Sequence, residues 1–263
     1  EAIPNLLITI LEQSGHFQGT SWARLKDLLR QSGKDAAAVS DEESGFEVCR
    51  KEGIDALVLG SYIKAGEAFA TDVKVLDVAS KQILRTASAR GDGVSSVLKT
   101  QIDEISRTIA RGLGPITAKL EIAPPKIADL TTSSMEAYNY FLRGRDDYEK
   151  FYYADARKFL EKAVALDPTF AVAYLYLGKT AGAIFDTRGQ TEAYEMAKKY
   201  SEKASEKERL YIEAGYASVI GKSPEKRLSL LLELTEQYPK QKQFHSELGH
   251  YYQNTKKLPE AIA

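Results

Sequence analysis

The stretch GRDDYEKFYYADARKFLEKAVALDP, from Gly144 to Pro168, decides the fold of the second half of this chain. Its small residues, Gly144, Ala156 and Ala163, stand where two antiparallel helices would have to approach each other closely. Pro168 then ends the second helix, because proline has no N–H with which to continue the helical hydrogen bonds. The stretch therefore predicts a hairpin of two helices, the unit from which stacked helical arrays are built.

The same spacing returns further along the chain. Gly178 follows Gly144 by 34 residues and Gly249 follows Gly215 by 34, whereas Gly178 and Gly215 are 37 residues apart. A fixed period of this length is typical of repeat proteins, in which each hairpin packs on the next. Four repeats are predicted, and the last is cut short because the pattern is still helical at Ala263.

The chain from 135 to 263 resembles the tetratricopeptide repeat family, whose period is also 34 residues. The likeness is strongest in the opening stretch and in LGHYYQNTKKLPEAIA, residues 248–263. The resemblance implies an all-α superhelix of about four repeats.

Repeats two and three depart from the family pattern. In repeat two, TAGAIFDTRGQTEAY is expected to lengthen the turn that follows Gly178, and Ser205 stands where proline is usual. Repeat three has Arg227 and Leu234 at positions for small residues, so looser packing or a different helix angle is expected. SEKE at 205–208 is a capping box, which predicts the start of the first helix of repeat three.

In this family, ligands lie along the inner surface formed by the first helix of each repeat, so the resemblance implies a partner-binding groove there. The candidate groove residues combine apolar, aromatic and cationic side chains, which suit an extended or helical peptide. They are Phe141, Arg145, Leu175, Lys179, Ile212, Tyr216, Ser246, His250 and Gln253. Chaperone-binding members hold a terminal carboxylate with lysines and asparagines, but Phe141 and Arg145 occupy those positions here, so that activity is not expected.

The first half of the chain begins with helices. Apolar residues at helical spacing predict a helix over residues 5–13, after Pro4 and Asn5, and a second helix that Ser21 caps. A third is predicted to run to about residue 52, and its capping box is Ser40 with Glu43.

The apolar period then changes from 3.6 to 2, which indicates strands. Three are predicted, over residues 55–63, 68–78 and 83–90, joined by tight turns as an antiparallel meander. The first is the richest in apolar residues and is expected to be central. A long amphipathic helix follows over 94–113, and residues 119–122 could add an edge strand.

This half resembles the amino-terminal α/β domain of the periplasmic translocation protein TolB, in the diverged form carried by bacterial signalling proteins. The likeness covers roughly residues 1–114 and rests on SWARLKDLLRQSG at 21–33 and on the order of elements over 47–92. Such domains usually open with an apolar strand before the first helix. That strand is missing here, so a sheet with one strand fewer is expected.

The predicted fold class is α+β with two domains. A TolB-like α/β domain, an antiparallel meander with helices, covers 1–122, and the tetratricopeptide superhelix covers 134–263. Between them, a linker over 123–133 contains a Pro-Pro pair and no sustained period.

Composition limits the classes of function. Lys and Arg number 36 against 37 for Asp and Glu, which argues against nucleic acid as the main partner and gives no sign of a membrane-surface patch. No apolar run is long enough for a membrane span. The single cysteine, Cys49, cannot form an intrachain disulfide and is expected to be buried.

Chemistry-bearing motifs are not found in the sequence. It contains no phosphate-binding loop, protein-kinase signature, HExxH or GxSxG. The three histidines, His16, His245 and His250, are too scattered for a metal or catalytic site, and the last two point about 140° apart on a helix. The expectation is therefore no enzyme, no cofactor and no metal.

These patterns favour a non-enzymatic interaction and scaffolding module that binds a protein or peptide in the groove. The resemblances imply the carboxy-terminal region of a bacterial signalling protein, such as a serine/threonine kinase, an adenylate cyclase or a transcriptional regulator, on either side of the membrane. The alternative is a small-ligand sensor, with its binding site in the α/β domain or at its junction with repeat one. A homodimer through the truncated end of the array is also possible, because an uncapped repeat exposes apolar surface.

Overall fold

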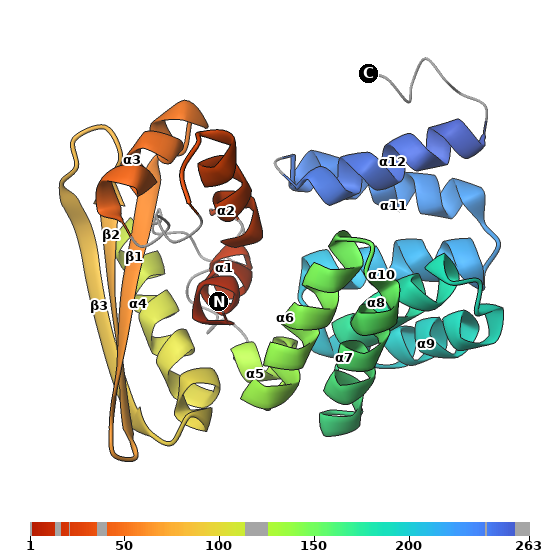
Figure 1. Ribbon diagram of the computed structural model, residues 1–263, viewed down its shortest axis with the longest axis horizontal. Coiled ribbons are helices and arrows are strands. Elements are labelled where there is room, and N and C mark those ends of the chain that lie inside the picture. The colour runs from red at the N-terminus through yellow and green to blue at the C-terminus, as the bar shows by residue number, and fades with distance from the viewer. Residues whose placement is uncertain are drawn as a thin grey trace. The chain divides into compact units, whose positions relative to one another are not determined.

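The computed structural model describes residues 2–13, 17–20, 22–35, 41–113, 126–239 and 241–255 (Figure 1). The chain divides into two compact units, Glu1–Ala128 and Asp129–Ala263, which we call the sheet unit and the helical unit. The structure thus combines a small antiparallel sheet with many helices, in agreement with the α+β class.

The sheet unit contains three antiparallel strands, β1 (Ala56–Ala65), β2 (Ala68–Asp77) and β3 (Ile83–Asp92). Each strand pairs with the next along the chain in the order β1-β2-β3, which confirms the meander. The expectation that the first strand is central is wrong, because β2 lies between the other two. Apolar content did not predict strand order, since Tyr62 and Ile63 of β1 are exposed.

In the described part of this unit, four helices and a π-helical turn accompany the sheet. They are α1 (Ala2–Glu12), α2 (Trp22–Gln31), α3 (Glu42–Lys51), the turn Val97–Gln101 and α4 (Ile102–Leu113). The first helix begins earlier than predicted, because Pro4 fits the first turn, where its missing N–H has no helical partner. At the third helix the cap is Asp41, whose side chain accepts from Ser44 N, in place of the predicted capping box.

The core of the sheet unit lies between the sheet and its helices. Val73 and Val75 of β2 are buried, as are Ile102, Ile105 and Ile109 of α4, which packs against β3. A second cluster joins α3 to β1 and includes Cys49, whose predicted burial is confirmed. The alternation predicted for β2 is therefore present.

A buried polar contact ties the π-helical turn to the central strand. The Gln101 side chain accepts from Thr71 Oγ1 at 2.8 Å and donates to the Phe69 carbonyl oxygen at 3.2 Å. Because both groups of the amide are satisfied, a buried glutamine is tolerated in this core.

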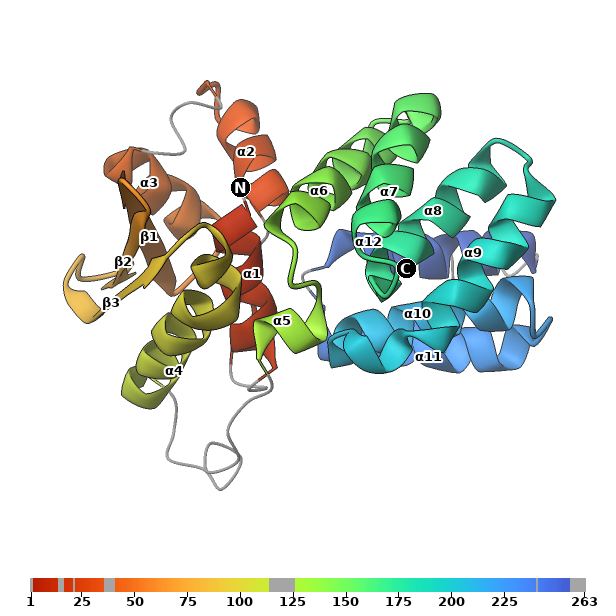
Figure 2. The same cartoon turned by 90° about the horizontal axis from the view of Figure 1, so that it is seen from below.

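The helical unit is built from helix hairpins. The first hairpin is α6 (Met135–Glu149) with α7 (Tyr153–Leu166), the second is α8 (Ala171–Ala183) with α9 (Thr187–Lys199), and the third is α10 (Glu206–Val219) with α11 (Pro224–Gln237). Helix α12 (Lys242–Asn254) packs against α11, and a short helix α5 (Ile127–Leu130) lies within the range predicted as linker (Figure 2).

The turn after Gly178 is not lengthened, which corrects the expectation from the sequence. The second helix begins nine residues after the glycine in all three hairpins, at Tyr153, Thr187 and Pro224. The additional residues lie instead around the connection from α9 to α10, where Ser201–Lys203 forms a 3-10 turn, and in a longer start of α10. The predicted capping box is present at that start.

The glycines at the hairpin positions fulfil different packing roles. A Cβ built on Gly144 would lie 2.6 Å from Leu160 Cγ, so the glycine lets α6 approach α7. A Cβ on Gly215 would lie 2.4 Å from the ring of Tyr194, which belongs to the preceding hairpin. The predicted contact within a hairpin therefore holds for the first hairpin, whereas the third receives a side chain from its neighbour.

Several predictions fall outside the described residues. They concern His16, the cap Ser21, Ser40 of the predicted capping box, the possible strand at 119–122, the Pro-Pro pair and the chain from 256 to 263. Within the described ranges, no helix is both long enough and apolar enough to cross a membrane.

Candidate functional site

Three of the nine candidate groove residues are buried. Phe141, Leu175 and Ile212 have at most 3% of their surface exposed. Phe141 packs edge-on against the Phe170 ring, with a centroid distance of 5.1 Å. These apolar side chains belong to the core between the helices, so they cannot contact a partner, and the groove predicted from them is corrected accordingly.

The other six candidates are at least partly exposed. Arg145, Lys179 and Tyr216 are half-buried on α6, α8 and α10. Ser246, His250 and Gln253 are exposed on α12 and complete the predicted set. The polar members of the prediction are therefore the accessible ones, as expected when burial of unpaired polar groups is costly.

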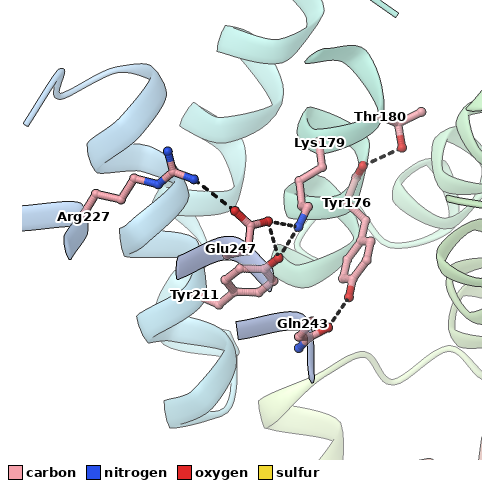
Figure 3. A network of polar contacts seen from close by, with 7 residues as sticks. All are labelled: Tyr176, Lys179, Thr180, Tyr211, Arg227, Gln243 and Glu247. Atoms are coloured by element: carbon pink, nitrogen blue, oxygen red, sulfur yellow. Dashed lines mark hydrogen bonds and ion pairs between the residues drawn. The ribbon is translucent and has the colours of Figure 1, made fainter. Parts of the chain in front are cut away.

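Lys179 lies at the centre of a polar cluster (Figure 3). Its ammonium group pairs with Glu247 of α12 at 2.6 Å and donates to the Tyr211 hydroxyl oxygen. That hydroxyl in turn donates to the same carboxylate at 3.0 Å, and Arg227 of α11 pairs with the other carboxylate oxygen at 3.0 Å. Four helices, α8, α10, α11 and α12, thus meet in what we call the Glu247 cluster.

Aromatic rings surround the ammonium group. Lys179 Nζ lies 4.6 Å from the ring centroid of Tyr211, 5.4 Å from that of Tyr148 and 5.8 Å from that of Tyr176. Each distance is within the range in which a cation is attracted to the face of a ring. The lysine is therefore held by rings as well as by the carboxylate.

The protonation states in the Glu247 cluster follow from its charges. Burial alone would raise the pKa of Glu247, but Lys179 and Arg227 outweigh it, so the pKa lies below its ordinary value. Burial and the nearby carboxylate raise the pKa of the Tyr211 hydroxyl well above its ordinary value. At neutral pH the carboxylate is therefore ionised and the hydroxyl keeps the proton that it donates.

A second contact connects α12 to α8. The Tyr176 hydroxyl donates to the Gln243 side-chain oxygen at 3.3 Å, one turn of α12 before Glu247. The two contacts span 67 and 68 positions of sequence. They join the first helix of the second hairpin to α12, which follows the third hairpin in the sequence.

A cavity of about 270 Å³ lies beside the Glu247 cluster. Residues from α6 and from α8 to α12 line it, among them Tyr148, Lys179, Tyr194, Tyr211, Arg227 and Glu247. Small residues of α8 and α10, including Ala183 and Ala214, also line it.

Tyr194 lies between helices of the second and third hairpins. Its ring touches the positions of Gly178 and Gly215, where a built Cβ would lie 3.0 and 2.4 Å from ring atoms. The side chain is 6% exposed, and burial raises the pKa of its hydroxyl. Within the described part of the chain this hydroxyl makes no hydrogen bond.

Sequence reasoning included Lys179 but missed its partners. Glu247 and Tyr211 occupy ordinary helical positions, so nothing in the local pattern distinguished them. Arg227 was noticed only as a large residue at a small position. The indication available in the sequence was Arg227 itself, because a charged residue at a position for a small one suggests a polar contact in place of close helix packing.

The arrangement is suited to binding. Among the described residues, no group of three His, Cys, Asp or Glu side chains lies close enough together to hold a metal ion. The Glu247 cluster offers cations, rings and a hydroxyl beside a cavity, which are the groups that fix the orientation of a bound molecule.

When it is compared with models of known protein families and with curated proteins, the sequence shows no match.

Proposed function

We propose that this chain is a non-enzymatic interaction module, in which a tetratricopeptide array binds a protein or peptide and a TolB-like α/β domain accompanies it. The three successive helix hairpins, with glycines 34 and 37 residues apart, support the array. The three-stranded meander with its packed helices is compatible with the accompanying domain.

The observation that carries the proposal is the accessible polar face of α12 beside the Glu247 cluster. Ser246, His250 and Gln253 are exposed on α12, and the half-buried Tyr216 belongs to the neighbouring hairpin. Exposed side chains around partly buried aromatic and cationic anchors are typical of protein-binding surfaces. A peptide partner would contact the exposed groups, and the Glu247 cluster would hold α12 in place.

A role in the cell follows from this proposal. The array would act as a scaffold in a bacterial signalling protein, and binding of the partner would alter an attached output domain such as a kinase, a cyclase or a transcriptional regulator. The near-zero net charge favours a protein over a nucleic acid as that partner.

Site-specific photocrosslinking tests the proposed surface. A benzoylphenylalanine at position 253 of α12 is expected to crosslink one defined protein in the native host, and Tyr216→Ala with His250→Ala is expected to abolish the product. The control carries the crosslinker at Arg188, which is fully exposed on α9. Identical products from both positions would contradict a binding surface on α12.

A further inference from the structure

The cavity beside the Glu247 cluster has a polar group that the proposed peptide surface does not use. The Tyr194 hydroxyl belongs to a side chain that is 6% exposed, lies on the cavity wall and has no hydrogen bond within the described residues. Its oxygen is reached by solvent, because the fully buried side-chain polar atom that lacks a partner among the described residues is Ser106 Oγ. The hydroxyl is therefore available to donate to a molecule in the cavity.

The charges on the cavity wall indicate an anion. Lys179 and Arg227 are both cationic, whereas Glu247 is the single anion among the described lining residues. Both oxygens of Glu247 are already engaged. Arg227 uses one of its five N–H donors in the described contacts, so donors and one positive charge remain for a further acceptor.

The shape and the walls indicate a small planar molecule. The rings of Tyr148, Tyr194 and Tyr211 line the cavity, together with small residues such as Ala183 and Ala214. A volume of about 270 Å³ is near the lower end of the range for ligand sites and fits a small molecule. Flat rings pack well against aromatic side chains at such distances.

We infer that this cavity is a binding site for a small aromatic carboxylate. The carboxylate would accept from the unused donors of Arg227, the ring would lie among the tyrosines, and the Tyr194 hydroxyl would gain a partner. The inference does not depend on the proposed peptide surface, because it uses the cavity wall and not the exposed groups of α12.

Occupancy of the cavity would also stabilise α12. Arg227 contacts both the cavity and Glu247, which is the residue that joins α12 to α8. A ligand bound to Arg227 would therefore hold in place the guanidinium group that also pairs with Glu247. Slower amide hydrogen exchange in residues 242–254 is expected when the ligand is bound.

The test uses benzoate as the probe, with two matched compounds of the same shape. Isothermal titration calorimetry of the full chain should show saturable binding of benzoate. Benzamide, which is neutral, and benzylamine, which is cationic, should bind at least about tenfold more weakly, because they lack the charge that Arg227 recognises.

Two variants place the binding in the cavity. Arg227→Met should weaken benzoate about tenfold, as expected for a lost charge-assisted contact, whereas the exposed control Arg188→Met should leave it unchanged. Tyr194→Phe keeps the ring and should weaken 4-hydroxybenzoate and benzoate by a smaller factor. Its control is Tyr140→Phe, because the Tyr140 ring stacks on Phe159 outside the cavity.

Three outcomes would overturn the inference. They are the absence of benzoate binding at millimolar concentration, equal affinity for benzoate and benzamide, and unchanged affinity in a correctly folded Arg227→Met protein. Any of them would show that the cavity does not recognise the carboxylate of a small aromatic acid. Photocrosslinking at position 253 would be unaffected by these outcomes, so failure of the ligand site and failure of the peptide surface can be told apart.

Discussion

The first hairpin and the two that follow it pack in different ways. In the first hairpin Gly144 lies against α7 of the same hairpin, and the rings of Tyr138, Phe141 and Phe170 fill the space on its inner side. In the second and third hairpins one side chain, Tyr194, contacts two glycines, and ion pairs and a cavity lie among the rings. The comparison teaches that a repeated glycine does not guarantee repeated packing. The candidate site lies where charged groups enter the aromatic core.

The largest expected loss of stability follows from a substitution at Gly144, where α6 and α7 of the first hairpin approach each other closely. Gly144→Val places methyl groups where a built Cβ already lies 2.6 Å from Leu160 and 3.1 Å from the carbonyl oxygen of Ala156. Overpacking against backbone should lower the free energy of unfolding by about 3 kcal/mol. Urea denaturation followed by far-UV circular dichroism measures it. Gly221→Ala is the control, because its nearest neighbour lies at 3.4 Å, and it should change stability little.

Removal of the central carboxylate should have the next largest effect. Glu247→Ala leaves Lys179 and Arg227 without their common anion in a partly buried place, which should cost about 2 kcal/mol. Urea denaturation gives the value. Glu192→Ala, which removes an exposed i,i+4 pair on α9, is the matched control. Equal effects of the two substitutions would show that the Glu247 cluster contributes no more than a surface ion pair.

The loss of stability at acid pH should depend on the same carboxylate, that of Glu247. A group whose pKa is lower in the folded than in the unfolded state adds stability above its unfolded pKa, and this is lost as the pH falls through the folded pKa. Glu247 is such a group. The stability of the wild-type chain should therefore fall more steeply than that of Glu247→Gln below about pH 4.3, the ordinary pKa of a glutamate. Parallel curves over this range would contradict the lowered pKa.

The start of the third hairpin should show a smaller effect. Ser205 forms a reciprocal capping box with Glu208, and Ser205→Ala should cost about 1 kcal/mol. Ser205→Thr keeps the hydroxyl and should restore most of the loss. Ser134→Ala, at the single-bond cap of the first hairpin, should cost less. Thermal unfolding of the three variants ranks them, and a larger loss at Ser134 would reverse the expected order.

The smallest expected effect is at Tyr194. Tyr194→Phe keeps the ring between the two glycines and removes a hydroxyl that has no hydrogen bond within the described residues. Stability in the absence of ligand should change by less than about 0.5 kcal/mol. In contrast, Tyr194→Ala should be strongly destabilising, because it leaves a cavity. A large loss in Tyr194→Phe would show that the hydroxyl has a partner.

Local chemistry explains what the sequence predicted well. The capping box at Ser205, the end of α3 near residue 52 and the meander between 56 and 92 all depend on residues a few positions apart. Short-range hydrogen bonding and alternation are enough to determine such features. The expected central position of the first strand was wrong, because apolar content does not determine which strand lies between the other two.

The site depends on contacts between distant residues. Lys179 and Glu247 are 68 positions apart, and Tyr194 reaches glycines in two other helices. No local pattern indicates such pairs. The prediction of the groove failed at Phe141 for a related reason, because membership of the inner helix does not tell whether a side chain points to solvent or into the core.

The central claim is that the polar contact between Lys179 of α8 and Glu247 of α12 stabilises the later part of the array. A double-mutant cycle with Lys179→Met and Glu247→Gln, measured by urea denaturation of the full chain, tests it most directly. The account predicts a coupling free energy of at least about 1 kcal/mol between these two positions. A value within about 0.3 kcal/mol of zero, the range for independent sites, would contradict it.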